Sequence, residues 1–149
     1  MAMKTENFSM TDIVSKQGKI VASEAELFDF LSDLRNLDSF IPHDKVQNWE
    51  SDEDSCSFSV PQAGQLSLRI TEKEPNKFIR IEPEGGATPF SFTFFIQIKN
   101  VAENDTRIKL TLRAELNMMM KTMFKGPLEK GLDQIVDTLS GLKLPTKEE

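Results

Sequence analysis

A long apolar-striped helix that follows a run of strands constrains this fold more than any other feature. The segment from Asn117 to Leu142 reads NMMMKTMFKGPLEKGLDQIVDTLSGL, and as a helix it can extend roughly 39 Å at about 1.5 Å per residue. At about 100° per residue its apolar side chains fall on one arc, and these are Phe124, Leu128, Leu132, Ile135, Val136, Leu139 and Leu142. Because this arc can cover the dry face of a sheet, we expect a curved sheet that holds the helix and encloses a cavity.

The first part of this helix does not share the same phase. In a straight helix Lys121 and Lys125 would lie on the apolar arc, while Met119 and Met123 would face water. Proline lacks the amide and clashes with the carbonyl four residues back. We therefore predict a bend near Lys125–Pro127, with both parts turning their apolar sides inward.

Methionine is concentrated at the start of the helix, where Met118, Met119, Met120 and Met123 lie within six residues. Methionine is flexible and polarizable, so it suits both irregular cores and adaptable binding surfaces. Both interpretations, core filling and contact with a ligand, stay open at this point.

A single strand and a capped helix are predicted near the start of the chain. The strand lies between Phe8 and Val21, and Gly18 can mark a bulge or bend in it. Ser23 and Glu26 have the spacing of a capping box. The helix that they open has apolar residues at helical spacing, namely Leu27, Phe28, Leu31 and Leu34.

Another short helix and six strands come next. The helix contains Leu37 and Phe40 and is stopped by Pro42. The six strand-like segments lie at residues 46–50, 56–60, 66–71, 78–82, 90–98 and 107–116. Apolar and polar residues alternate cleanly in the last two, with Phe95 as the exception on the polar side. This pattern predicts an antiparallel meander with one dry face and one wet face.

Composition excludes several classes of protein. The 149 residues carry a net charge of −6, which disfavours nucleic-acid binding, and contain no apolar run near the roughly 20 residues of a membrane span. We expect one domain over residues 1–149. A single cysteine and a single histidine supply too few ligands for a typical zinc site, and we expect no metal or cofactor. The single cysteine also rules out an internal disulfide, which fits a cytoplasmic protein.

The order of a strand, two short helices, six strands and a long C-terminal helix, over residues 8–142, resembles the helix-grip fold of the START-like (SRPBCC, Bet v 1-like) superfamily. The run Phe40-Ile41-Pro42, the strand Arg107 to Leu116 and the helix start at Asn117 look most similar to bacterial members of unassigned function. The resemblance implies an α+β fold, in which a curved antiparallel seven-stranded sheet surrounds the C-terminal helix.

Two departures limit what the resemblance carries over. The plant allergens of this superfamily have a glycine-rich loop where this chain has Ser51-Asp52-Glu53-Asp54. The ring-hydroxylating oxygenases of the superfamily use a metal-ligand set that needs more histidines than this chain has.

Candidates for chemistry are few. His43 can act as an acid or base near neutral pH, or it is an ordinary loop residue. Cys56 alternates with Phe58 and Val60 on one strand face, so it is either a core residue or the nucleophile of a pair with His43. Trp49 can line a pocket or shield a sheet edge. We assign no catalytic residue.

The leading hypothesis is a soluble protein that binds a small hydrophobic molecule or lipid between the sheet and the C-terminal helix. The residues predicted to line the site are Phe92, Phe94, Leu112, Met120, Phe124 and Leu128. The alternatives are a polyketide cyclase or aromatase, marked by two or more titratable side chains in the cavity, and a protein-interaction module like the activators of the Hsp90 ATPase, marked by a filled core and an apolar surface patch.

Overall fold

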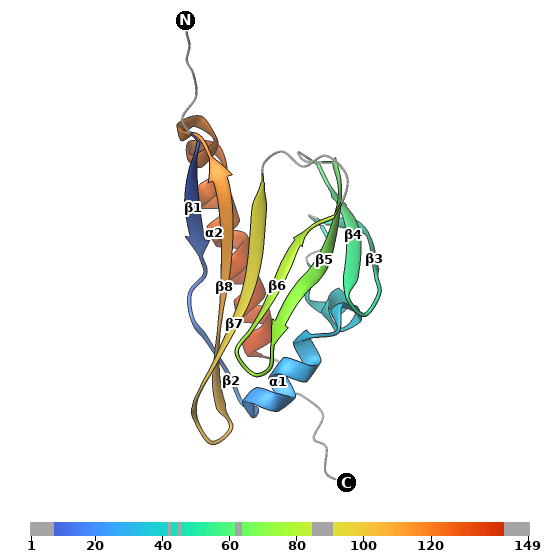
Figure 1. The fold of residues 1–149 in the computed structure, drawn as a ribbon, viewed down its shortest axis with the longest axis vertical. Helices are drawn as coiled ribbons and strands as arrows, with labels where there is room; N and C mark the ends of the chain where they lie inside the picture. Colours follow the sequence, from blue (N-terminus) through green and yellow to red (C-terminus); the bar gives the residue numbers. More distant parts are fainter. Residues whose placement is uncertain (1–7, 42, 45, 62–63, 85–90, 142–149) are drawn as a thin grey trace, which may run out of the picture.

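The computed structural model describes residues 8–41, 43–44, 46–61, 64–84 and 91–141. Within these residues an antiparallel sheet curves around the helices in the strand order β1-β8-β7-β6-β5-β4-β3, and β2 also pairs with β8 (Figure 1). The elements are β1 Ser9–Val14, β2 Gly18–Ile20, α1 Glu24–Leu31, the 3-10 helix η1 Leu34–Phe40, β3 Gln47–Ser51, β4 Ser55–Val60, β5 Gly64–Glu74, β6 Phe78–Pro83, β7 Phe92–Ala102, β8 Asp105–Leu116 and α2 Met118–Ser140. The predicted α+β helix-grip architecture is confirmed.

The predicted first strand is divided into β1 and β2, so the described part of the chain forms a sheet of eight strands where seven were expected. Both pieces pair with β8. Between them Ser15 is buried; its amide donates to the Leu110 carbonyl over 2.8 Å, and its hydroxyl accepts from the Leu110 amide over 2.9 Å. The side chain of Ser15 thus continues the ladder through the break, and the bend that Gly18 suggested lies just before that glycine.

Helix α1 begins with the predicted capping box. The Ser23 hydroxyl accepts from the Glu26 amide over 3.1 Å, and the Glu26 carboxylate accepts from the Ser23 amide over 3.0 Å. Its apolar side buries Leu27, Phe28 and Leu31. The second helix is the 3-10 helix η1, and Pro42, which was predicted to stop it, lies outside the described residues.

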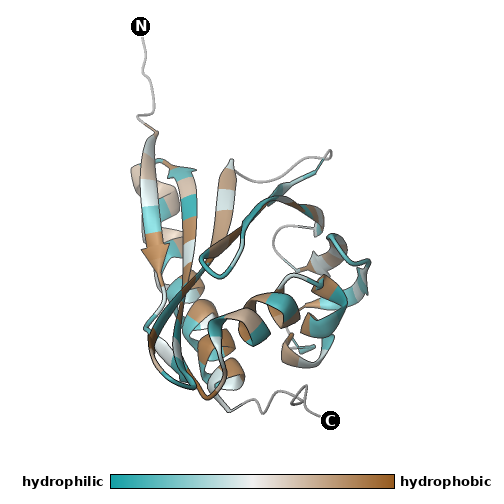
Figure 2. Ribbon diagram, turned by 60° about the horizontal axis from the view of Figure 1, so that its bottom comes forward, coloured by the Kyte–Doolittle hydropathy of each residue, from teal (hydrophilic) through white to brown (hydrophobic). Residues whose placement is uncertain are grey.

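The helices lie on one side of the curved sheet (Figure 2). We call the sheet face that they cover the inner face and the opposite one the outer face. Alternation along β7 and β8 places buried residues on the inner face, because Ile96 pairs with Leu110 and Ile98 with Ile108. The main contacts of α2 are with β1, β2, β8 and η1, so α2 covers one end of the inner face.

Helix α2 runs unbroken through Pro127 from its N-cap at Asn117, whose side chain accepts from the Met120 amide. The expectation that both parts turn their apolar sides inward is wrong for Met119 and Met123, which are 68% and 58% exposed. Lys125 and Pro127 are also exposed. On this wet side, water can hydrogen-bond the carbonyl group that the proline leaves without a donor, so the helix needs no break there.

Candidate functional site

The first wall of the candidate site is the inner face of β7 and β8. Phe94 pairs with Leu112 across the ladder, and Phe92 pairs with Ala114. Leu112 is 7% exposed, whereas Phe92 and Phe94 are half-buried and pack against the core. On this part of the inner face the β8 residues are therefore buried, and the aromatic residues of β7 beside them are only partly covered.

The second wall is the start of α2. Met120, Phe124 and Leu128 recur every four residues, which places them on one side of the helix. All three are half-buried, and Met120 and Leu128 pack against the same core as Phe92 and Phe94. The structure thus brings five of the six predicted residues to one cluster, with Phe124 on the same side of the helix.

A third wall was missed by the sequence analysis. It consists of half-buried apolar side chains from α1, η1 and β3–β5, all of which pack against the core, namely Phe30, Leu37, Phe40, Trp49, Phe58 and Leu68. Phe30 and Phe40 meet edge to face with ring centroids 5.9 Å apart. The alternation of Cys56 with Phe58 was visible in the sequence, but the contact of β3 with η1 was not.

Trp49 is the polar feature of this third wall. The register of β3 against β4 shifts between Gln47 and Glu50, and Asn48 takes the left-handed conformation at φ 57°. Such a bulge redirects the next side chain, and the Trp49 ring stacks on Phe58 with centroids 5.7 Å apart. The indole Nε1 is buried and finds no hydrogen-bond acceptor among the described residues. A buried donor without a partner is costly, and a ligand or water acceptor would relieve that cost.

No contact between His43 and Cys56 is found among the described residues, so the structure does not support them as a catalytic pair. His43 is exposed, and its Nε2 lies 3.1 Å from the Asp38 carbonyl oxygen. Cys56 is buried, and burial raises the pKa of its thiol to about 12. A thiol with this pKa stays protonated at neutral pH, so it has the properties of a core residue.

Buried polar side chains in the described part of the chain carry hydroxyl groups only. They are Ser15, Thr106 and Thr111. Thr106 donates to the Ala22 carbonyl over 2.7 Å, and Thr111 donates to Gln97 over 2.8 Å. The buried carboxylates, amines or imidazoles that would mark a cyclase are thus not found among the described residues. The same residues contain no cluster of three or more potential metal ligands.

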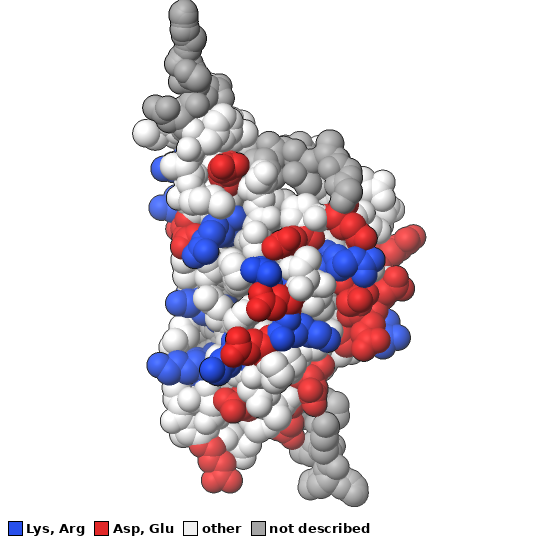
Figure 3. Space-filling model, viewed as in Figure 1, with Lys and Arg blue, Asp and Glu red and all other residues white. Residues whose placement is uncertain are grey.

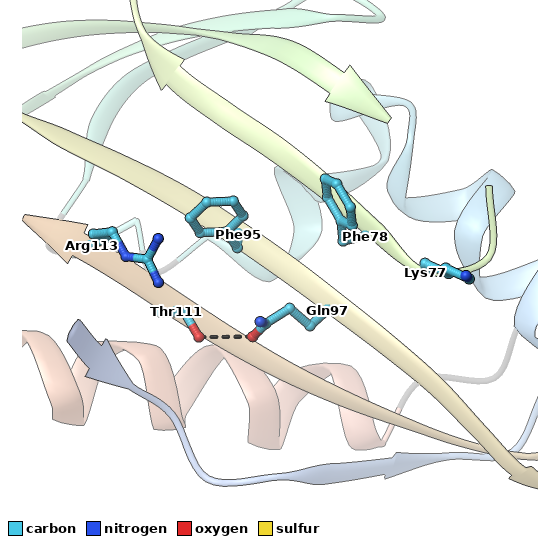
Figure 4. Close-up of a pocket in the computed structure, with 6 residues that line it drawn as sticks. All are labelled: Lys77, Phe78, Phe95, Gln97, Thr111 and Arg113. Carbon is cyan, nitrogen blue, oxygen red and sulfur yellow. Dashed lines mark hydrogen bonds between the residues drawn. The ribbon is translucent and has the colours of Figure 1, made fainter. Parts of the chain in front are cut away.

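A pocket of about 380 Å³ lies on the outer face (Figure 4). Its lining comes from β6, β7, β8 and the residue before β6, and none of the six predicted residues takes part. The lining residues are Lys77, Phe78, Phe95, Gln97, Thr111 and Arg113. The sequence analysis had marked only Phe95 as an exception to the alternation.

Comparison with solved structures identifies the fold. A START superfamily protein from Mycobacterium smegmatis superposes with a TM-score of 0.67 at 15% identity, over 89% of this chain and 94% of that one. The chain has the START-like, helix-grip fold. Norcoclaurine synthase from Thalictrum flavum gives a TM-score of 0.69 at 10% identity, over 91% of this chain and 87% of the synthase. The Rhizobium loti protein Mll3558 gives 0.66 at 11% identity, over 91% and 98% of the two chains.

These three proteins share the fold with this chain at identities that do not define its activity. The Thalictrum synthase has also been solved in complex with dopamine and hydroxybenzaldehyde. No protein-family model matches the sequence, and no curated protein matches it. No helix in the described part of the chain is both long and apolar enough to cross a membrane.

Proposed function

We propose that this START-like chain binds a small hydrophobic or lipid-like molecule between the inner face of the sheet and α2. The observation that carries the proposal is the set of half-buried apolar side chains on β7, on the start of α2 and on the third wall, all of which pack against the core. A folded core normally covers such aromatic groups, because each buried aromatic side chain stabilises the fold by about 1.5–3 kcal/mol. The partial exposure of these side chains therefore supports a binding surface that an apolar molecule completes.

The position of α2 explains why this surface is incompletely covered. The helix packs mainly on β1, β2 and β8, while β3, at the other edge of the sheet, contacts η1. Val136 and Leu139, near the C-terminal end of α2, are fully buried, whereas Met120 and Leu128 nearer its start are only partly buried. We place the ligand at the half-buried end, against Phe92, Phe94, Leu112, Met120, Phe124 and Leu128.

Trp49 supplies the polar part of this proposal. Its buried Nε1–H has no acceptor among the described residues, so a carbonyl, hydroxyl or carboxylate oxygen on the ligand would accept that hydrogen bond. An amphipathic molecule with one acceptor therefore fits better than a pure hydrocarbon. We also propose the cytoplasm as the compartment, because the chain has a single cysteine.

The test uses two neighbouring phenylalanines that point to opposite faces. Phe94 pairs with Leu112 on the inner face, while Phe95 pairs with Thr111 on the outer face. We expect Phe94→Trp to weaken the binding of a fluorescent fatty acid at least tenfold, because the larger ring occupies the ligand position. Phe95→Trp makes the same change on the other face and is expected to leave that affinity unchanged.

Thermal unfolding of both variants separates a blocked site from a damaged fold. We expect the melting temperature of Phe94→Trp to stay close to that of the parent protein, since Phe94 is only half-buried. Unchanged fatty-acid affinity in a folded Phe94→Trp protein would contradict this placement of the ligand.

A second candidate function, a protein-interaction module, has one specific observation in its favour. Met118, Met119 and Met123 at the start of α2 are exposed, as is Met10 on β1. Met10 pairs with Glu115, close to where β8 leads into α2, so these methionines come from neighbouring segments. If the parent protein takes up no apolar molecule, this exposed apolar surface becomes the leading candidate for function.

A further inference from the structure

Two phenylalanines on the outer face break the polar pattern that the rest of this face follows. Phe95 lies between Thr93 and Gln97 in the outward positions of β7 and pairs across the ladders with Arg80 and Thr111. Phe78 on the neighbouring strand meets it edge to face, with ring centroids 6.4 Å apart. Both rings are only half-buried. They therefore leave aromatic surface open to solvent on a face where β8 carries charged residues.

The rings form one side of the outer-face pocket of about 380 Å³ (Figure 4). This volume is at the small end of the range of about 300–1,000 Å³ for ligand pockets. It suits a molecule of one or two rings better than a lipid chain. The site is separate from the inner surface, because Phe95 and Phe94 point to opposite faces of the same strand.

The pocket lining holds an amide group and a guanidinium group that can donate hydrogen bonds. The Thr111 hydroxyl donates to Gln97 Oε1 over 2.8 Å, which leaves the Gln97 Nε2 group to donate elsewhere, and no partner for it is found among the described residues. Figure 4 shows Gln97 and Arg113 on either side of Thr111. None of the six lining residues carries a carboxylate. The Gln97 amide and the Arg113 guanidinium are the donors on this side of the pocket, and donors of these two kinds favour an anionic group.

Charges around the pocket agree with this assignment. The Arg113 guanidinium lies 5.5 Å from the centroid of the Phe95 ring and also contacts Asp12, with Nε 2.9 Å from Oδ1. Lys109 pairs with Gln97 across the strands, and no carboxylate lies within ion-pair distance of it among the described residues. Figure 3 shows basic side chains predominating over β1 and β8 and acidic ones gathered toward β3–β5. An anion is thus attracted to the β8 side of the pocket.

We propose that this outer-face pocket binds a small aromatic carboxylate, with its ring against Phe78 and Phe95 and its carboxylate at Arg113 and Gln97. Asp12 competes with the ligand for the Arg113 guanidinium, because both offer carboxylate oxygens to the same donors. Removing the Asp12 charge should therefore tighten binding, and removing the Arg113 charge should weaken it. A purely structural role for the Phe95–Arg113 contact predicts neither effect.

The experiment is a titration of the full chain with 2-naphthoate, followed by ¹⁵N–¹H NMR. We expect saturable shifts of the Phe78, Phe95, Gln97 and Thr111 amides with a dissociation constant below about 1 mM. Arg113→Gln should raise this constant at least fivefold, and Asp12→Asn should lower it about two- to fivefold. The matched control is Arg69→Gln, which removes a cation of β5 that pairs with Asp54 and Glu84. This control should leave the dissociation constant unchanged.

Two further measurements keep the result specific. The neutral analogue 2-naphthalenemethanol should bind at least fivefold more weakly than 2-naphthoate, because it lacks the anionic acceptor. Phe94→Trp, which blocks the inner surface, should leave 2-naphthoate binding unchanged, so the two proposals can fail separately. Shifts confined to inner-face residues, or equal affinities in Arg113→Gln and Arg69→Gln, would overturn the outer-face assignment.

Discussion

Gly18 lies where β2 meets α2, and it gives the sharpest test of how the helix is held. It is buried at the first position of β2. A Cβ atom added there would come within 2.6 Å of Val136 Cγ1 and of Ser140 Oγ, and within 3.2 Å of Ile108 Cγ2. Carbon atoms in contact prefer about 3.5–4.0 Å. The change Gly18→Ala therefore forces α2 and β2 apart.

The expected cost follows from which neighbour can move. Ser140 is at the end of α2 and its hydroxyl can rotate, but Val136 is fully buried and its branched side chain is stiff in a helix. Overpacking of this kind costs about 1–3 kcal/mol in the free energy of unfolding. For a chain of this size, a loss of about 2 kcal/mol lowers the melting temperature by roughly 4–8 °C.

The assay is urea unfolding, followed by circular dichroism, of four variants: Gly18→Ala, Val136→Ala, the two changes combined, and Gly131→Ala. Gly131→Ala makes the same change inside α2, where nothing lies within 4 Å of the added atom, and it should raise the unfolding free energy by about 0.4–1 kcal/mol. Gly18→Ala combined with Val136→Ala should lose less than the sum of the single changes, because the smaller side chain removes the clash. A Gly18→Ala protein as stable as its parent would refute this packing of α2 on β2.

Three other predictions follow from local contacts. Ser23→Ala removes the acceptor of the Glu26 amide and should lower the free energy of unfolding by about 1 kcal/mol, measured by urea unfolding; no change would contradict the capping role. The Cys56 thiol, with a pKa raised to about 12 by burial, should react with a thiol reagent at pH 8 only as fast as the chain unfolds, and rapid labelling of the folded protein would contradict its burial. The hydrogen bond from Arg113 lowers the pKa of Asp12, so this pair should stabilise the fold above about pH 4 and lose its effect as the pH falls through the lowered pKa. Asp12→Asn should therefore flatten the acid side of the stability–pH curve slightly, and an identical curve would show that the pair contributes nothing.

The sequence predicted the elements that depend on local pattern. Alternation along β8 gave the buried set that includes Ile108 and Leu110, because each apolar residue there has a polar neighbour that marks the other face. The capping box at Ser23 was equally visible, since both of its hydrogen bonds join residues three positions apart.

Features that depend on distant partners were not predictable in the same way. The break between β1 and β2 rests on the contact of Ser15 with Leu110, 95 residues away in the chain. The course of α2 through Pro127 depends on which side of the helix faces water, and the apolar pattern of the first turns pointed to the wrong side for Met119 and Met123.

The two candidate sites differ in the same respect. Phe92, Phe94 and Leu112 could be placed together because they lie on adjacent strands with clear alternation. The role of Trp49 needed the bulge in β3, and the outer pocket needed the register that sets Phe78 beside Gln97. The prediction of a single domain over residues 1–149 stays a prediction.

We have proposed that the inner surface of this START-like fold binds an apolar molecule. Native mass spectrometry of freshly purified protein, followed by organic extraction and identification of bound compounds, tests it most directly. We expect a stoichiometric adduct of a hydrophobic or amphipathic molecule, or stoichiometric uptake of a fatty acid whose affinity Phe94→Trp lowers at least tenfold. A mass that matches the bare chain, together with no uptake of a fatty acid or of a fluorescent hydrophobic probe, would contradict it.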